Sequence, residues 1–279
     1  MLKVLKSGFY TTIQDIGRFG FRDKGVPVSG IMDIETVYKL NALLENEEDA
    51  AVLEITMTGP TLEFEEDTFI TLGGAEFLIT LNNEPVDSYE VLKIKSGDIL
   101  SYGRLKKGFR AYLAIKDGLK SQIFLGSRSY YPYINPKGII KDRATIPYTK
   151  TSLFKPKLPE LKVDDPLDEY VLAVGKGPEF TMLSDKQLEQ LFFKEFTVAN
   201  ENNRMAYQLN EEISGHKVSM LTSATLPGTV QFTPSGKLII LMKDGQTTGG
   251  YPRILQLTDK AISILAQKKA GDTVLFRLI

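Results

Sequence analysis

Two glycine-rich stretches of this sequence concentrate the polar side chains that could bind a small ligand. The first runs from residue 11 to residue 33, and its polar residues alternate with glycines: Gln14, Asp15, Arg18, Ser29 and Asp33. Glycine lets a backbone approach a ligand closely, and arginine can form two parallel hydrogen bonds to a carboxylate or phosphate. The pattern predicts a ligand-binding loop. The alternative is a set of tight turns in which Asp33 only caps a helix.

The second stretch, residues 244–253, follows an apolar strand and carries more hydrogen-bond donors than a turn needs. Gly249-Gly250 is a suitable two-residue hairpin turn, so a plain hairpin is one interpretation. The other is a binding loop for an amide or a carboxylate, because amide, hydroxyl, phenol and guanidinium groups gather in it. These side chains are Gln246, Thr247, Thr248, Tyr251 and Arg253.

A third stretch and the single histidine are weaker candidates for chemistry. Arg128 lies between Ser127 and Ser129, either as a binding residue or in an ordinary polar loop that forms a surface ion pair. The absence of cysteine excludes disulfides, thiol nucleophiles and cysteine-type zinc sites, and His216 has no second histidine beside it. We interpret His216 as a surface turn residue and expect no metal on this chain.

Composition restricts the class of protein further. The chain has 279 residues, of which 42% are hydrophobic and 25% charged, as in an ordinary globular protein of one or two domains. Its 34 basic and 35 acidic residues give a net charge of −1, which argues against nucleic acid as a partner. No phosphate-binding G-x-x-x-x-G-K-[ST] loop and no long apolar run occur in the sequence. We therefore expect a cytoplasmic, unprocessed protein that binds no membrane.

Short β-branched segments bounded by turn residues predict a mainly β fold. Three helices are expected: after Asp33, from a capping box at Ser184, and over residues 259–267. Strands are expected over residues 68–72, 77–81, 111–115, 170–174 and 237–242. Prolines in residues 155–166 predict a stiff connector between an N-terminal half, 1–154, and a C-terminal half, 167–279.

The two halves also contain similar segments in the same order. Residues 53–64 align with residues 221–232, and the Gly-Asp pair at 97–98 aligns with the pair at 271–272. A repeat would mean two homologous small antiparallel barrels or sandwiches, each with a Gly-Asp turn before its last strand. Chance similarity between apolar β segments is the alternative.

Together these stretches resemble the biotin-dependent carboxyltransferase-like family, which includes the C subunit of 5-oxoprolinase, KipA and the protein formerly called allophanate hydrolase subunit 2. The resemblance covers nearly the whole chain, and it implies two cyclophilin-like β-barrel domains. The segments that carry it are 11–18, 25–30 with Asp33, 73–75, 110–114, 125–128 and 246–253.

The resemblance implies an enzyme subunit that is inactive alone. Together with a KipI-like B subunit, plus a metal-dependent A subunit, such a protein takes part in the ATP-dependent opening of 5-oxoproline to L-glutamate. One alternative is a KipA-type regulator that binds a KipI-like inhibitor of a histidine kinase. Another is the carboxyltransferase component of a biotin-dependent urea or amide carboxylase, in which carboxybiotin would arrive on another protein. No cofactor is expected on this chain.

Both reactions require an amide oxygen to be held by positioned donors while charge develops on it. We expect catalytic roles for Gln246, Thr248, Arg253 and Asp15. Substrate-binding roles are expected for Gln14, Arg18, Ser29, Asp33, Thr247, Tyr251 and Arg128. The hypothesis places the residues after 244 on one side of a cleft and those before 34 on the other.

The sequence departs from the family pattern in the same regions. Gly245 stands where relatives usually have arginine, and Ser223 where they usually have glutamate. Asp117-Gly118 replaces a Gly-Gly pair, and residues 130–136 replace a glycine-rich loop. Losing one positive and one negative residue is either a compensated pair or a sign of altered chemistry.

Overall fold

The computed structural model describes residues 1–163 and 166–279 and divides them into two compact units. The first unit comprises Met1–Arg18 and Ser29–Pro166, and the second comprises Phe19–Val28 and Leu167–Ile279. Residues 19–28 therefore belong to the second unit, not to the expected N-terminal half. In the expected connector, residues 164 and 165 lie outside the described residues. Its preceding part hydrogen-bonds to the first unit, where the Val91 N–H donates to the Pro159 carbonyl at 2.8 Å.

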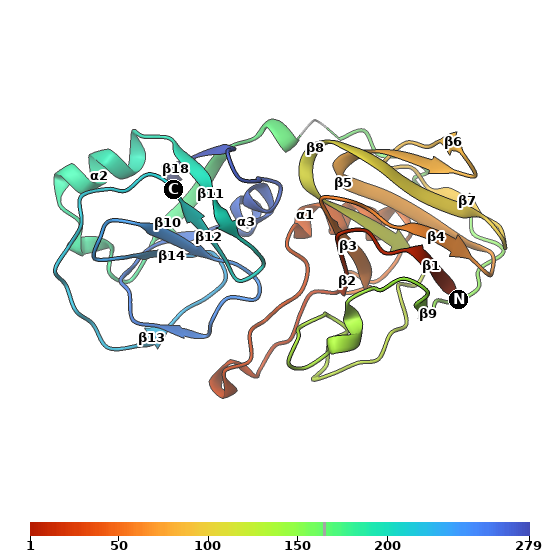
Figure 1. Cartoon of the computed structure of the whole chain (residues 1–279), viewed down its shortest axis with the longest axis horizontal. Coiled ribbons are helices and arrows are strands. Elements are labelled where there is room, and N and C mark those ends of the chain that lie inside the picture. The colour runs from red at the N-terminus through yellow and green to blue at the C-terminus, as the bar shows by residue number, and fades with distance from the viewer. Residues whose placement is uncertain (164–165) are drawn as a thin grey trace. The chain divides into compact units, whose positions relative to one another are not determined.

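The first unit is built on one antiparallel sheet with the order β2-β3-β8-β4-β1-β9, to which β5 adds β6 and β7 (Figure 1). Two long strands, β5 and β8, form its centre. The strands are β1 (Leu2–Lys6), β2 (Tyr10–Gln14), β3 (Val52–Thr56), β4 (Thr61–Phe64), β5 (Thr68–Leu81), β6 (Glu84–Pro85), β7 (Leu92–Ile94), β8 (Ile99–Ile115) and β9 (Thr145–Ile146).

Helix α1 (Ile34–Leu43) covers part of this sheet. Its buried residues, including Val37 and Leu40, pack with the strand residues Val52, Phe69 and Tyr112. Asp33 caps the helix, as the sequence predicts, because its side chain accepts a hydrogen bond from the Thr36 N–H.

The second unit is a closed barrel in the order β10-β17-β14-β15-β12-β11-β18, completed by the parallel pairing of β10 and β18. A small sheet, β13 (Ser223–Ala224) with β16 (Thr248–Gly249), lies outside the barrel path. The barrel strands are β10 (Val171–Lys176), β11 (Phe196–Asn202), β12 (Ala206–Leu209), β14 (Thr229–Phe232), β15 (Leu238–Leu241), β17 (Arg253–Leu257) and β18 (Thr273–Leu278).

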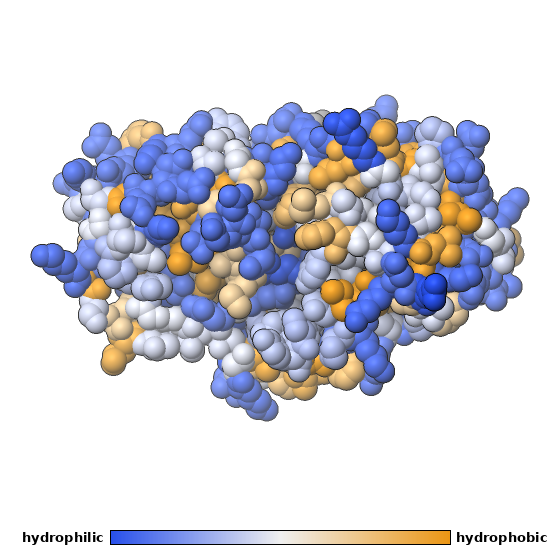
Figure 2. Space-filling model, viewed as in Figure 1, coloured by the Kyte–Doolittle hydropathy of each residue, from blue (hydrophilic) through white to orange (hydrophobic). Residues whose placement is uncertain are grey.

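The second unit also contains α2 (Asp185–Phe192) and α3 (Asp259–Ala266). The Ser184 capping box is present, and Thr258 caps α3. Short 3-10 helices occur at Arg22–Lys24, Pro136–Gly138, Pro166–Asp168 and Phe180–Met182. Within the described residues, no helix combines the length and apolarity needed to cross a membrane. The apolar strand residues are buried, and the surface mixes hydrophilic side chains with scattered apolar ones (Figure 2).

The mainly β expectation and the three helices are confirmed, whereas two details are wrong. The described sheet of the first unit is open, so only the second unit is a closed barrel. Residues 68–72 and 77–81 also form one strand, β5, because Gly74 adopts a φ of +86° and the chain continues its pairing with β8. A Cβ at Gly74 would approach the Arg110 carbonyl oxygen to 2.5 Å, so this bend requires glycine.

The aligned Gly-Asp turns have the same geometry in both units. The φ angles are +91° at Gly97 and +90° at Gly271. In each turn the aspartate accepts a hydrogen bond from the backbone N–H three residues before it, at 2.7 Å for Asp98 and 2.9 Å for Asp272. The turn is therefore a real structural correspondence between the halves.

The rest of the aligned repeat does not correspond in strand pairing. Strand β4 pairs with β1 and β8, whereas the aligned strand β14 pairs with β15 and β17. The N–H of the turn glycine donates to Phe64 on β4 in the first unit and to Val198 on β11 in the second. By this contact β11, and not β14, is the counterpart of β4. Alternating apolar residues align easily between unrelated strands, which explains the difference.

Candidate functional site

The carboxylate of Asp15 organises the first glycine-rich stretch. It accepts hydrogen bonds from Ser127 Oγ at 2.5 Å, the Arg128 N–H at 2.5 Å, Ser129 Oγ at 2.6 Å and the Gly17 N–H at 2.9 Å. The side chain is buried, and three of these donors come from residues 127–129, more than a hundred positions away in the sequence. Such a saturated carboxylate holds the loops together, so its geometry favours a positioning role over the predicted catalytic one.

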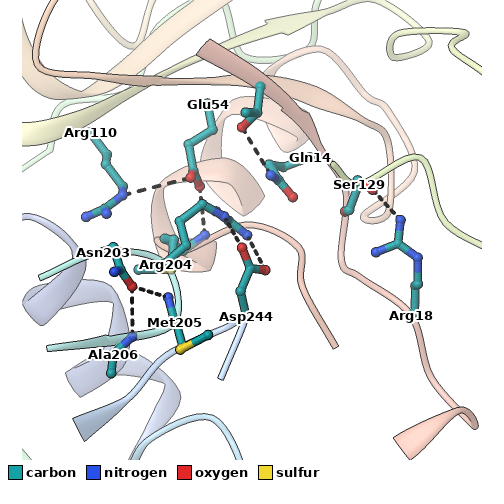
Figure 3. A network of polar contacts seen from close by, with 12 residues as sticks. Gln14, Arg18, Glu54, Arg110, Ser129, Asn203, Arg204, Met205, Ala206 and Asp244 are labelled. Carbon is teal, nitrogen blue, oxygen red and sulfur yellow. Dashed lines mark hydrogen bonds and ion pairs between the residues drawn. The ribbon is translucent and has the colours of Figure 1, made fainter. Parts of the chain in front are cut away.

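Arg18 and Arg128 are drawn into the same loop system. Arg18 is buried and donates to the Ser129 carbonyl (Figure 3). Arg128 donates from its backbone to Asp15 and from its guanidinium to the Ser121 carbonyl. Both arginines were predicted to bind substrate, and in the structure both hold the backbone of the first unit.

A cavity of about 360 Å³ opens beside Asp15 in the first unit. Arg128 and Lys120 contribute positive charge to its wall. Its other ionisable residues are acidic: Asp15, Glu45, Glu47, Asp49 and Asp117. The excess of carboxylates disfavours an anionic ligand, so this cavity does not fit the expected carboxylate substrate.

The remaining predicted residues of the first stretch are buried. Gln14 Nε2 donates to Thr12 Oγ1 at 3.1 Å, while neither Gln14 Oε1 nor Ser29 Oγ has a hydrogen-bond partner among the described residues. Ser29 has a φ of +56°, in the left-handed region, and Gly30 packs against the backbone of residues 15–17. Asp33 accepts from Thr36, which confirms the helix cap, and its role in substrate binding stays a prediction.

A buried charged network in the first unit was missed from the sequence. Glu54 Oε2 accepts from the Met32 N–H at 2.9 Å and from Tyr112 Oη at 3.0 Å, and Tyr112 Oη accepts from the Asp33 N–H. Arg110 Nε lies 3.9 Å from Glu54 Oε1 (Figure 3). Burial, reinforced by the negative charge of Glu54, raises the pKa of Tyr112 well above its ordinary value. The sequence signal that could have indicated this network is Glu54, a glutamate between apolar residues of a strand.

In the second unit the stretch from Asp244 to Tyr251, here called the Gln-Thr-Thr loop, is held by backbone contacts. Thr225 Oγ1 donates to the Gln246 carbonyl at 2.5 Å, and the Thr225 N–H donates to the Thr247 carbonyl at 3.0 Å. Arg22 donates to the Thr225 carbonyl. The segment at 19–28 thus supports the same loop through Thr225.

Ion pairs fix the chain at the first residue of the loop and at Arg253, two residues after its last. At the start, Asp244 forms a buried bidentate pair with Arg204, with Nε to Oδ2 at 2.9 Å (Figure 3). At the end, Arg253 donates through Nε and Nη2 to Glu179 at 2.9 and 2.8 Å, and through Nη1 to the Ala224 carbonyl. The hydrogen bond from Arg253 lowers the pKa of Glu179. Arg253 was predicted to be catalytic, and here it is engaged within its own unit.

The side chains between these anchors remain available to a ligand. Gln246, Thr248 and Tyr251 are exposed and Thr247 is half-buried. An exposed amide, two hydroxyls and a phenol on a fixed backbone can hydrogen-bond a carbonyl or carboxylate oxygen. The structure brings the predicted loop residues together in the second unit and the predicted residues around Asp15 together in the first unit. It stays a prediction that these two groups line one cleft.

Of the positions where this sequence departs from the family pattern, Gly245 has a local structural explanation. A Cβ at Gly245 would lie 2.9 Å from the Met242 carbonyl oxygen and 3.1 Å from that of Met205, so a larger residue would require the backbone to shift. Ser223 lies on β13 opposite Gly249. Among the described residues, no group of three or more His, Cys, Asp or Glu side chains could hold a metal ion.

Comparison with known families decides the assignment. The family described as "Carboxyltransferase domain, subdomain A and B" matches residues 24–278. This chain belongs to that family. The resemblance to the carboxyltransferase family that the sequence indicates is confirmed.

Relatives of two kinds are similar to it over nearly its whole length. The chain is 32% identical to the C subunit of 5-oxoprolinase from Escherichia coli over 282 residues, which is 99% of this chain and 90% of the relative. It is 27% identical to urea amidolyase of Saccharomyces cerevisiae over 301 residues, 99% of this chain but 16% of that protein.

Solved structures agree on the fold. The urea amidolyase of K. lactis matches with a TM-score of 0.88 and 28% identity, covering 99% of this chain and 18% of that chain. TTHA0988 matches with a TM-score of 0.85 and 25% identity, covering 99% of this chain and 55% of that chain. This chain thus spans about half of one of these structures and less than a fifth of the other.

Proposed function

We propose that this chain is the C subunit of an ATP-dependent 5-oxoprolinase that converts 5-oxoproline to L-glutamate. The observation that carries the proposal is the 32% identity to the C subunit of 5-oxoprolinase from E. coli. The similarity covers 99% of this chain and 90% of that protein. The proposed partners are a KipI-like B subunit, which would bind this chain, and a metal-dependent A subunit. The chain itself would bind no cofactor.

The Gln-Thr-Thr loop gives this function a physical basis. Opening a lactam places negative charge on the ring carbonyl oxygen, and donors on a fixed backbone stabilise that charge without having to reorganise. Gln246, Thr247 and Thr248 are presented between two ion-paired anchors. In the proposed reaction they bind the lactam oxygen, while Arg253 fixes the loop through Glu179.

The test is reconstitution of the complex from purified components. Glutamate release from 5-oxoproline and ATP should require this chain together with the KipI-like and the metal-dependent partner proteins, and it should stop when any one is omitted. Release that continues without this chain would refute the proposal. A stable complex with the KipI-like protein that lacks turnover would instead favour the KipA-type regulator.

A second candidate is a carboxyltransferase that acts on urea or a similar amide. The TM-score of 0.88 to urea amidolyase supports it, although this chain spans only 18% of that protein. Under this alternative carboxybiotin would arrive on another protein. Urea-dependent consumption of carboxybiotin by the isolated chain, with no glutamate release from 5-oxoproline in the complex, would favour this candidate.

A further inference from the structure

A buried carboxamide in the second unit has hydrogen-bonding capacity that its surroundings leave unused. Gln231 lies on β14 and is 1% exposed. Its Nε2 has no acceptor within hydrogen-bonding distance among the described residues. A buried amide donor without a partner destabilises a protein, so a native chain that keeps one requires a reason.

The carboxamide of Gln231 lies directly against the Gln-Thr-Thr loop. A Cβ added to Gly249 would collide with Gln231 Nε2 and would lie 3.0 Å from Gln246 Nε2. Glycine at position 249 therefore allows the loop backbone to approach both carboxamides. A single residue of this loop thus contacts the buried amide and the exposed amide at once.

Gln246 covers Gln231 through a weak contact. Its Nε2 donates to Gln231 Oε1 at 3.5 Å, the outer limit for a hydrogen bond, and its side chain is exposed. Moving the Gln246 side chain outward costs little, because water replaces that contact. The movement releases Gln231 Oε1, while Nε2 lies against the backbone of Gly249 in the same loop.

A primary carboxamide has a specific complementary partner. It presents an N–H donor and a C=O acceptor side by side, so it forms two parallel hydrogen bonds with any group that does the same. A cis amide does so, because its N–H and C=O lie on one edge, and the ring of a lactam fixes this form. Urea also has such an edge, whereas a trans peptide amide places the two groups on opposite edges.

We propose that Gln231 is a substrate-binding residue that pairs with the cis-amide edge of a lactam or urea after Gln246 releases Gln231 Oε1 and turns its own N–H toward the carbonyl oxygen of the ligand. The identification of the lactam as 5-oxoproline rests on the proposed function. The edge-pairing chemistry is common to 5-oxoproline and urea. Gln231 Nε2 gains the acceptor that it lacks, and Oε1 exchanges a weak donor for a well-aligned one.

Nuclear magnetic resonance of the full chain tests this directly. The side-chain NH2 signal of Gln231 is assigned by its loss in Gln231→Met. It should shift on addition of 2-pyrrolidinone, 5-oxoproline or millimolar urea. N-methyl-2-pyrrolidinone, which lacks the N–H, should bind about tenfold more weakly, the factor expected for one hydrogen bond. N-methylacetamide, a trans amide, should cause no saturable shift.

The alternatives are separated by the same titrations. Saturable shifts with 5-oxoproline only, or with urea only, identify which source of the cis-amide edge the site accepts. Absence of any saturable shift, or equal affinity for all the amides, would overturn the proposal. The titration does not depend on turnover, so an inactive complex that still shows the shift refutes the 5-oxoprolinase function but not the binding site.

Stability provides an independent readout with a matched control. Gln231→Met removes an unpaired buried donor, so the thermal midpoint should rise or stay unchanged while binding of 2-pyrrolidinone is lost. Gln256 on β17 is a glutamine whose Nε2 donates to the Pro227 carbonyl at 2.7 Å and whose Oε1 accepts from Thr229 Oγ1 at 2.9 Å. Gln256→Met should lower the midpoint by about 2–4 °C. A comparable fall for Gln231→Met would mean that Gln231 is structural.

Discussion

At the scale of single residues, the Asp15 carboxylate bridges segments that are more than a hundred positions apart in the chain. Two of its four donors are the serine hydroxyls of residues 127 and 129. Asp15→Asn replaces one acceptor oxygen by a donor that faces these hydroxyls. We expect the free energy of unfolding to fall by about 2–3 kcal/mol, because buried polar groups lose their partners. Denaturant titration measures this loss.

The control for Asp15 is Asp117→Asn. Asp117 lines the same cavity, but its side chain is 42% exposed. Asparagine also tolerates the positive φ of this position. The control should therefore change the unfolding free energy by less than about 0.5 kcal/mol. Equal effects of the two substitutions would show that the Asp15 cluster is not an anchor.

Glu179 gives the Arg253 anchor a pH dependence. The hydrogen bond from Arg253 lowers the folded-state pKa of Glu179 below its ordinary value of 4.5. The unfolded chain therefore binds the proton more readily, and the pair stabilises the fold fully above that value and loses its effect as the pH falls through the folded-state pKa. Glu179→Gln should flatten the acid part of the stability curve, measured by urea titration at several pH values.

Glu189→Gln is the matched control for that curve. Glu189 is exposed on α2, where solvent screens its charge, so the acid dependence of the wild-type protein should be retained. If Glu179→Gln and the wild-type protein lose stability in parallel below the ordinary glutamate pKa, the ion pair does not stabilise the loop anchor.

At the scale of elements, the two Gly-Asp turns have equivalent positions, directly before the long strand β8 in the first unit and before β18 in the second. Asp98→Ala and Asp272→Ala each remove a side-chain acceptor for a backbone N–H. Each should cost about 1 kcal/mol of unfolding free energy. Asp98 also accepts from Asn82 Nδ2, so its loss should be at least as large. A measurable cost at one turn only would contradict their equivalence.

The Gln-Thr-Thr loop depends on a different element, the short strand β13 and the threonine that follows it. Thr225→Val keeps the shape of the side chain but removes the donor to the Gln246 carbonyl. Amide hydrogen exchange over residues 246–249 should accelerate about fivefold, as expected when a local opening loses about 1 kcal/mol. Unchanged exchange would mean that the Thr225 hydroxyl does not help to hold the loop.

The elements that could be predicted from the sequence were those with strong local signals. The capping box at Ser184 and the Asp33 cap position two helices, because capping depends on residues only three apart. The open sheet of the first unit and the partner of each aligned strand depend on pairings between distant segments, which apolar alternation does not specify.

The same reasoning explains the site. The polar loop residues Gln246, Thr247 and Thr248 could be found from composition, because polar residues beside glycines stand out. The partners that immobilise Asp15 and Arg253 could not, since Ser129 and Glu179 are 114 and 74 positions away. Gln231 was hidden because one polar residue in an apolar strand resembles any strand residue.

At the scale of the whole molecule, one carboxyltransferase-family chain contains an open sheet and a closed barrel. The first unit contains the fully hydrogen-bonded carboxylate of Asp15 and an acidic cavity, and the second presents exposed amide, hydroxyl and phenol groups. The second unit is therefore where we expect the lactam to bind. Under the proposed function, both units belong to a larger assembly with the KipI-like and metal-dependent proteins.

The proposed function is tested most directly by following the ring opening of carbon-13-labelled 5-oxoproline by the three-protein mixture with ATP. We predict that labelled glutamate forms with this chain present and that its formation stops when this chain alone is left out. The same rate of glutamate formation in both mixtures would contradict the claim that this chain is a necessary component of the enzyme.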